Sequence, residues 1–157
     1  MHIELKRICV ATDFSAPANR AFQYGLVFAR QFGAELHLLH VIEDVIPTVP
    51  EPGLAMLPTQ EIMNSLRKAS EEGMNKLAAG QDVQGVALRQ AVREGVPFRE
   101  ICDYAKREAI DLVIVGTHGR AGLTHLLLGS VAERVVRSAP CPVLTIHSDE
   151  HEFIKED

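Results

Sequence analysis

The sequence predicts a doubly wound α/β fold, in which helices cover both faces of one parallel sheet. Short apolar runs alternate with amphipathic stretches along the chain, in the order β-α-β-α-β-α-β-α-β. This alternation indicates parallel strands joined by helical crossovers, and the right-handedness of such crossovers leaves few topologies. The length of 157 residues fits one domain with a substantial core. We therefore expect a single five-stranded, Rossmann-like sheet in the strand order 3-2-1-4-5.

The first two strands and the helix between them have clear boundaries. Residues 7–12 (RICVAT) form an apolar run that ends in polar residues, as a buried strand would. Ser15 precedes Ala16-Pro17, which is typical of a helix start. Apolar residues then recur at helical spacing until Gly33, a common helix stop. Residues 35–41 (ELHLLHV) predict the second strand.

The segment from Glu43 to Pro58 interrupts this alternation. It holds half of the chain's eight prolines, which predicts a loop. Long loops over a rigid scaffold often serve as binding lids, and an inert surface connection is an equally good interpretation here. Thr59 can then cap a second helix, which Gly80 ends.

The later strands continue the same pattern. Residues 85–92 (GVALRQAV) predict the third strand, and Pro97 opens the third helix. Residues 111–115 (DLVIV) are the clearest strand in the chain, because their last four positions are all apolar. Residues 142–146 predict the last strand.

The last helix has a recognisable start. Ser130 and Glu133 match a capping box, in which the serine hydroxyl and the glutamate side chain satisfy free N–H groups of the first turn. Its buried face is expected to carry Val131, Val135 and Ala139.

Composition argues against several classes of partner. The net charge is −5 and no Lys/Arg-rich run occurs, so neither a nucleic-acid-binding face nor a membrane-surface segment is expected. No apolar stretch approaches the roughly 20 residues of a membrane span. The three cysteines are scattered, without C-x-x-C spacing, which favours reduced thiols in a cytoplasmic protein.

The segment from Gly116 to Ser130 carries the predicted chemistry. It places four glycines directly between a strand and a helix. Glycine lets backbone N–H groups approach an anion closely, and the following helix presents free N–H groups at its positive end. The Arg120 charge and the Ser130 hydroxyl add to this, so we favour phosphate binding. The alternative is that the glycines turn the chain and Ser130 only caps its helix, although both roles can hold for Ser130.

Other phosphate-binding classes do not match. No G-x-x-x-x-G-K-[ST] motif occurs, which excludes a P-loop NTPase. The turn at residues 12–15 contains no glycine, so the dinucleotide-binding fingerprint is missing where it should lie. No lysine follows the last strand, which argues against a response-regulator receiver domain.

No metal ligands or catalytic residues are predicted. His118 and His125 lie seven residues apart without an acidic partner. His37 and His40 point to opposite faces of their strand, which suggests packing rather than ligation. Asp13 is either a cap of the first helix or, because it closes the first strand, a ligand contact.

The chain resembles the universal stress protein family in several segments. The spacing Gly116-x2-Gly119-x9-Gly129-Ser130 is similar to the family's ATP-binding signature. The segments ICVATDFS, ELHLLHV, EGVPFREI and SAPCPVLTI also resemble family motifs, in the family's order. The resemblance covers nearly all of residues 6–147. It implies a nucleotide-binding domain over residues 1–147. The residues that follow, 148–157, are polar and acidic, and we expect them to form an acidic, flexible tail.

The resemblance implies ATP with Mg²⁺ as the ligand. In that arrangement Asp13 accepts hydrogen bonds from the ribose hydroxyls, and Ala11 and Thr12 line the adenine and ribose side. The backbone of Val41 meets the adenine.

The phosphate side would be formed by two further sets of residues. The residues implied to pass under the ribose and phosphates are Gly116, His118, Gly119 and Arg120. The residues implied to hold the distal phosphates are Gly129, Ser130, Val131 and Ala132.

Three functions fit these residues. The leading one is a nucleotide-dependent stress or signalling module, in which ATP shifts a conformational or partner-binding equilibrium. The second is a slow ATPase or self-phosphorylating enzyme, which the resemblance allows. The third is a structural dimer without ligand.

A homodimer is expected through the last strand, residues 142–146. In the predicted topology this strand lies at an edge of the sheet, where unpaired backbone groups invite pairing with another chain. Pro142 stands at the strand's start and the rest of the strand carries no charge. The resemblance points to the same pairing. The alternative is that the acidic tail covers this edge.

Overall fold

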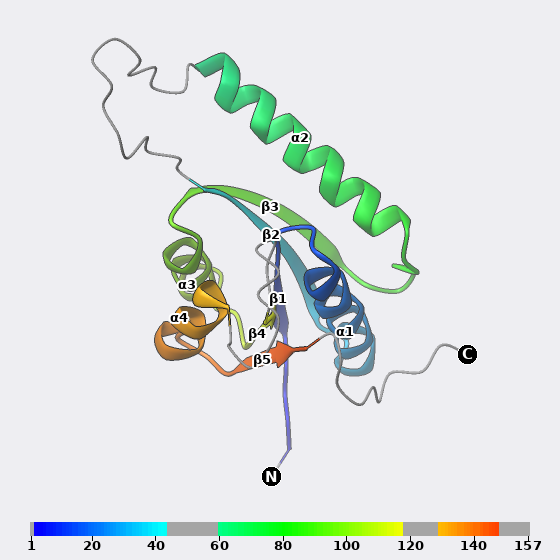
Figure 1. Ribbon diagram of the computed structural model, residues 1–157. Coiled ribbons are helices and arrows are strands. Elements are labelled where there is room, and N and C mark those ends of the chain that lie inside the picture. The colour runs from blue at the N-terminus through cyan, green and yellow to red at the C-terminus, as the bar shows by residue number, and fades with distance from the viewer. Residues whose placement is uncertain (1, 44–59, 118–128, 148–157) are drawn as a thin grey trace.

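The structure is a computed structural model and describes residues 2–43, 60–117 and 129–147. Predictions for residues 44–59, 118–128 and 148–157 lie outside the described residues. Figure 1 shows the elements, which are β1 (Arg7–Thr12), α1 (Ala16–Phe32), β2 (Glu35–Glu43), α2 (Gln60–Ala79), β3 (Leu88–Gly95), α3 (Pro97–Arg107), β4 (Leu112–Gly116), α4 (Ser130–Ser138) and β5 (Val143–Ile146).

The five strands form one parallel sheet in the order β3-β2-β1-β4-β5, which confirms the predicted topology. β1 lies at the centre and pairs with β2 from Arg7–Glu35 to Thr12–His40. Because all strands are parallel, their carboxyl ends meet at one edge of the sheet. That edge is where a ligand site is expected, since the strand order reverses at β1.

Helices cover both faces of the sheet, as predicted. Figure 1 shows α1 and α2 on one side and α3 and α4 on the other. The core is correspondingly divided into two apolar clusters, one between the sheet and α1 and α2, the other between the sheet and α3 and α4. Both clusters are closely packed. In the first, a Cβ added at Gly25 of α1 would lie 2.5 Å from a methyl group of Val10.

The caps of α1 follow the sequence prediction. Ser15 is the N-cap, and its hydroxyl accepts a hydrogen bond from the Ala18 N–H at 3.4 Å. Pro17 stands in the first turn, where a missing N–H costs nothing. Gly33 ends the helix in the left-handed conformation, with φ 65°.

The prediction for β3 was displaced by three residues. The strand covers Leu88–Gly95, whereas residues 85–92 were expected. Gly85 instead belongs to a turn, with φ 74°, and the strand continues through the charged residues Arg93 and Glu94. β3 is an edge strand, which tolerates charge, so its apolar run does not mark its end.

The predicted start of α4 was also wrong. Gly129 is the N-cap, and Ser130 is already the first helical residue, so its hydroxyl makes no cap hydrogen bond. Glu133 pairs with Arg137 one turn later, at 3.0 Å, and completes no capping box. The buried face carries Ala132 and Val135, whereas Val131 is 38% exposed.

Within the described residues, no helix is long and apolar enough to cross a membrane.

Candidate functional site

Thr117 joins the ends of β4 and β5 to the start of α4. Its N–H donates to the Ile146 carbonyl at 3.0 Å, and its carbonyl accepts from the Gly129 N–H at 2.5 Å. Its buried hydroxyl lies 2.8 Å from His147 Nδ1. These contacts place the N-terminus of α4 directly beside the carboxyl end of β4. The glycines at the two ends of the predicted phosphate segment, Gly116 and Gly129, are thereby brought together.

The first turn of α4 presents backbone donors at this edge. The first hydrogen bond within the helix runs from the Glu133 N–H to the Gly129 carbonyl at 2.9 Å. The N–H groups of Ser130, Val131 and Ala132 therefore precede the helical ladder, at the positive end of the helix. The side chain of Ala132 is buried in the core, so this residue can offer only its backbone.

The turn between β1 and α1 positions Asp13 at the same edge. The Phe14 N–H donates to Thr12 Oγ1, and the Ser15 N–H donates to Asp13 Oδ1, both at 3.0 Å. These two local bonds fix the turn immediately after the strand. The Asp13 carboxylate is thus held, partly buried, at the carboxyl end of β1.

Val41 directs its backbone past the end of β1. The Glu35 N–H donates to Lys6 on the β1 side of β2, and the Leu36 N–H donates to Ala87 on the β3 side. Backbone groups alternate in direction along a strand, so the odd-numbered residues of β2 face β1. The β1–β2 pairing ends at Thr12–His40. The Val41 carbonyl is therefore the first on this side of β2 that lies beyond the paired part of β1.

Three of the predicted site residues lie on the side of the sheet that α3 and α4 cover. Ala11 and Val41 are partly buried and pack against the apolar cluster beneath α3 and α4, to which Ala132 also belongs. This arrangement gives the edge an apolar surface next to its polar groups. Such a combination suits a ligand with a flat apolar ring and charged substituents.

Gly116 has a structural reason to be glycine. A Cβ at this position would lie 2.7 Å from the Pro17 carbonyl carbon and 2.9 Å from the Ala18 nitrogen. The end of β4 packs directly on the first turn of α1, and backbone atoms cannot move aside as a flexible side chain would. The lack of a side chain at Gly116 is therefore required before any ligand is considered.

The structure positions nine of the predicted site residues, and three lie outside the described residues. Those positioned are Ala11, Thr12, Asp13, Val41, Gly116, Gly129, Ser130, Val131 and Ala132. His118, Gly119 and Arg120 lie outside the described part of the chain.

Two further residues, Thr117 and Phe14, shape this edge and were not predicted from the sequence. A threonine in a glycine-rich segment matches no binding motif, and a single phenylalanine in a polar turn has no evident role in binding. Phe14 could have been identified from its place between Asp13 and the N-cap residue Ser15, because this turn contains no glycine.

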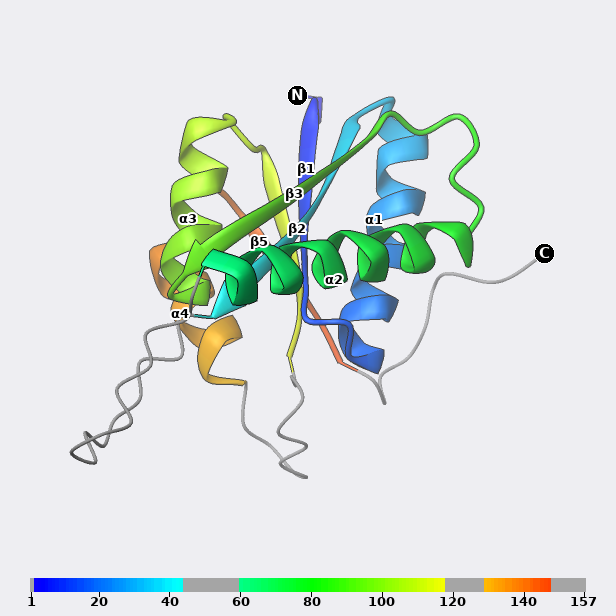
Figure 2. The same cartoon turned by 90° about the horizontal axis from the view of Figure 1, so that it is seen from above.

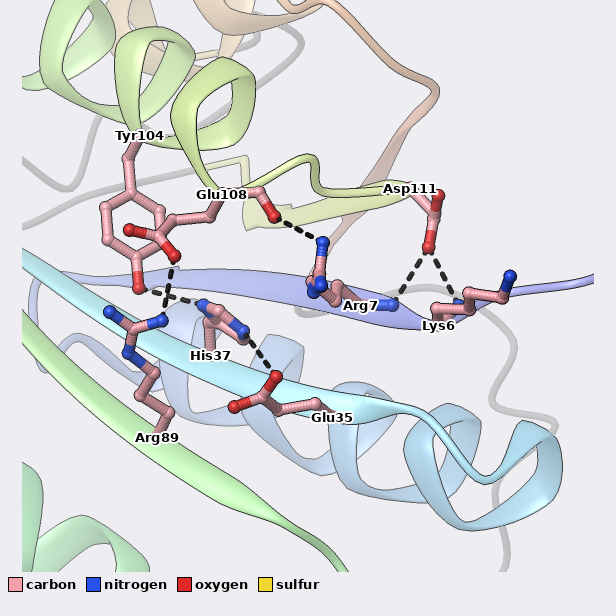
Figure 3. A network of polar contacts seen from close by, with 8 residues as sticks. All are labelled: Lys6, Arg7, Glu35, His37, Arg89, Tyr104, Glu108 and Asp111. Carbon is pink, nitrogen blue, oxygen red and sulfur yellow. Dashed lines mark hydrogen bonds and ion pairs between the residues drawn. The ribbon is translucent and has the colours of Figure 1, made fainter.

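A polar network lies at the opposite, amino end of the strands (Figure 3). Asp111 accepts hydrogen bonds from the N–H groups of Lys6 and Arg7 at 2.8 and 2.9 Å. The fully buried His37 ring lies 2.8 Å from the Tyr104 hydroxyl. Burial, with a smaller effect from the neighbouring Cys9, raises the pKa of Tyr104 to about 12. This network anchors β1 and β2 to the strands and helices beside them.

His37, His40 and the three cysteines pack as expected from the sequence. His37 contacts α3, whereas His40 stacks on Phe14 and packs toward α2, so the two rings do face opposite sides of the sheet. Cys9, Cys102 and Cys141 are free thiols, and burial raises the pKa of each. In the described ranges no group of three or more potential ligands could hold a metal ion.

Comparisons with known proteins agree on one family. Residues 4–147 match the model of the universal stress protein family. Universal stress protein MJ0531 of Methanocaldococcus jannaschii is 36% identical over 148 residues, which cover 94% of this chain and 85% of that protein. The solved structure of MJ0577, from the same organism, is similar with a TM-score of 0.78 at 30% identity, covering 95% of this chain and 100% of that one.

Two more distant structures share the fold and contain ligands. A universal stress protein in complex with cAMP matches with a TM-score of 0.65 at 21% identity, covering 92% of this chain and 98% of that one. One from Archaeoglobus fulgidus, in complex with dAMP, matches with a TM-score of 0.60 at 19% identity, covering 92% and 99%.

Proposed function

This chain belongs to the universal stress protein family, and from that premise we propose that it binds ATP at the carboxyl ends of β1, β2 and β4. The family has a role in the stress response. The proposed activity is that of a nucleotide-dependent module, in which bound ATP shifts a conformational or partner-binding equilibrium. A cytoplasmic location and a homodimer formed through β5 are part of the same proposal.

The observation that carries the proposal is the position of the α4 N-terminus. The hydrogen bond from Gly129 to Thr117 holds it at the carboxyl end of β4. The N–H groups of Ser130, Val131 and Ala132 and the positive end of the helix dipole then suit the distal phosphates. His118, Gly119 and Arg120 are assigned to the phosphates on their spacing in the sequence.

The adenosine end of the ligand fits the neighbouring strands. The Asp13 carboxylate is suited to accept hydrogen bonds from ribose hydroxyls, beside Thr12. The Val41 carbonyl, beyond the paired part of β1, is suited to accept from the adenine amino group. Ala11 supplies apolar surface for the ring. β2, β1 and β4 are successive neighbours in the sheet, so an elongated ligand can place its base over β1 and β2 and its phosphates near β4.

Mg²⁺ would reach the site with the nucleotide. Phosphate oxygens and water would supply most of its coordination, as is usual for this ion. The ion would neutralise phosphate charge next to the α4 N-terminus.

The ligands of the two distant family structures support the class of ligand. Both cAMP and dAMP are adenine nucleotides. The step from these ligands to ATP rests on the glycine spacing of residues 116–130 and on the donors at the α4 N-terminus.

The test is binding of Mg-ATP by the wild-type chain. At 100 times its dissociation constant a ligand stabilises a fold by about 2.7 kcal/mol, which should raise the melting temperature by several degrees. Mg-GTP and magnesium tripolyphosphate serve as controls for the base and for the phosphates alone. Mass spectrometry of nucleotide carried through purification gives an independent measurement. The proposal fails if millimolar Mg-ATP gives no thermal shift and no adenine nucleotide copurifies.

A further inference from the structure

Phe14 adopts a backbone conformation that phenylalanine rarely takes. Its φ is 64°, in the left-handed region, where only glycine, asparagine and aspartate are common. It stands between Asp13, which is proposed to bind ribose, and Ser15, which caps α1. A residue in such a conformation keeps it only if its surroundings hold it there.

The Phe14 ring is held by two elements that are distant in sequence. Its face packs on the ring of His40 in β2, with centroids 4.6 Å apart and planes inclined by 34°. His40 is itself fixed, because its Nδ1 lies 2.8 Å from the Thr12 carbonyl. The tip of the Phe14 ring reaches α2 at Gly73.

Gly73 forms a notch in α2 that admits the ring. A Cβ at this position would lie 2.9 Å from Phe14 Cζ and 3.1 Å from Cε1, closer than van der Waals contact allows. Glycine inside a helix is unfavourable relative to alanine, and Gly73 lies well inside α2. The close approach of Phe14 accounts for its presence there.

These contacts connect α2 to the position of Asp13. The Phe14 N–H is bonded to Thr12 Oγ1 and the Ser15 N–H to Asp13 Oδ1, both at 3.0 Å, so the turn moves as a unit with its ring. Figure 2 shows α2 running crosswise to the strands, and the tip of the Phe14 ring meets this helix at Gly73. A shift of α2 along this contact would displace the ring, and with it the carboxylate.

We propose that Phe14 is a positioning residue of the nucleotide site and that α2, through Gly73, sets how Asp13 meets the ribose. The inference rests on the proposed function, because it concerns the same site. A displacement of α2 at Gly73 would therefore change the affinity for the nucleotide.

The test compares the same substitution at two positions of the α2 region. Gly73→Ala places a methyl group against the Phe14 ring. Gly80→Ala follows the end of the helix, where a Cβ would have no neighbour closer than 3.6 Å. Calorimetry gives the affinities for Mg-ATP and Mg-2′-deoxy-ATP, and thermal melting without nucleotide reports on the fold.

The affinity ratio distinguishes positioning from general destabilisation. A hydrogen bond from the 2′-hydroxyl to a carboxylate should favour ATP over 2′-deoxy-ATP by roughly tenfold in the wild-type protein. We expect Gly73→Ala to bring this ratio close to one, whatever its effect on the melting temperature, and Gly80→Ala to leave the ratio unchanged. A general loss of stability would weaken both nucleotides equally and leave the ratio intact.

A second variant, Phe14→Ala, tests the same contact from the side of the ring. This variant should also bring the ratio close to one, because it removes the ring that connects α2 to the turn at Asp13. An unchanged ratio in either variant would overturn the inference while leaving ATP binding intact. A wild-type chain that binds neither nucleotide would overturn the proposed function, and this inference with it. If Phe14→Ala does not fold, the comparison of the two glycine positions decides alone.

Discussion

The backbone N–H of Gly129 donates a hydrogen bond to the carbonyl of Thr117 at 2.5 Å. This bond sets the start of α4 beside the end of β4. The positive end of α4 therefore lies near the position between β1 and β4 where the strand order reverses, although many residues separate α4 from β4 in the sequence.

Gly129→Val should weaken ATP binding strongly while the fold survives. The Gly129 backbone has φ −55° and ψ 145°, a conformation that any residue adopts, so valine adds no backbone strain. Its branched side chain would stand where the phosphates approach the α4 N-terminus. We expect a loss of affinity of at least about tenfold, as for a lost charge-assisted contact, with a melting temperature near that of the wild type. Unchanged affinity would remove Gly129 from the phosphate site.

Asp13→Ala should cost roughly ten- to a hundredfold in ATP affinity, because a charged hydrogen-bond acceptor is lost. It also removes the acceptor of the Ser15 N–H. Asp13→Asn separates the two effects, since the amide oxygen can still accept from Ser15 and keep the turn. Calorimetry should therefore place Asn between wild type and Ala. Equal affinities for all three proteins would contradict a role for Asp13 in binding.

Gly116→Ala should destabilise the protein with or without nucleotide. The added methyl group would lie 2.7 and 2.9 Å from backbone atoms of Pro17 and Ala18. Overpacking of this kind costs about 1–3 kcal/mol, which should lower the melting temperature by several degrees. Gly80→Ala, which meets no such contact, is the control. An unchanged melting temperature of the nucleotide-free variant would show that the packing of β4 on α1 does not require glycine.

Gly116 and Gly129 show how far the sequence could predict the site. The glycine spacing predicted that both of them bind the ligand. In the structure Gly116 is required by the packing of β4 on α1, a contact between distant segments that spacing cannot reveal. Ser130 similarly matched a capping box, yet Gly129 is the N-cap residue of α4. The Gly129 N–H is bonded to the Thr117 carbonyl, a contact that the capping-box pattern does not reveal.

The fold was predictable wherever burial and local signals agreed. β1 and α1 start and end as expected, because a buried strand is apolar throughout and Ser15 and Gly33 mark the helix ends. β3 was displaced because an edge strand can include Arg93 and Glu94. The left-handed Phe14 was not predictable either, since it depends on a notch in α2 formed by Gly73, far along the chain.

The stability of the protein should fall as the pH rises from about 10 to 12, in part through Tyr104. Burial raises the pKa of Tyr104 from its ordinary value of about 10 to about 12. Between these values the unfolded chain has lost the proton and the native protein has kept it, so rising pH favours unfolding. The contribution is complete below pH 10 and is lost as the pH passes through 12.

Tyr104→Phe tests this dependence. The variant should lose about 1–3 kcal/mol at pH 7, because the buried His37 ring loses its partner. The difference from the wild type should then narrow between pH 10 and 12, as measured by urea unfolding. Cys9 is present in both proteins, so most of the effect of its own raised pKa is common to both. A difference that stays constant with pH would contradict the assignment to Tyr104.

Thr145→Pro should convert a dimer of this chain to a monomer. β5 is an edge strand, and the Val113 and Thr117 N–H groups donate to the carbonyls of Pro142 and Ile146. The even-numbered residues of β5 therefore face β4, and the N–H of Thr145 faces the open edge. The same edge of a second copy can pair with it antiparallel across a twofold axis.

Two proline variants distinguish the two sides of this strand. Thr145→Pro removes an N–H donor that faces the open edge. The molecular mass measured by light scattering should therefore fall from about twice the 17.3 kDa chain mass toward that mass, while the fold persists. Leu144→Pro removes a donor that faces β4 and should lower the melting temperature instead. The two variants should differ because the Thr145 N–H would bond to the partner chain, whereas the Leu144 N–H faces β4 of the same sheet. A wild-type protein that is monomeric at micromolar concentration would refute pairing through β5.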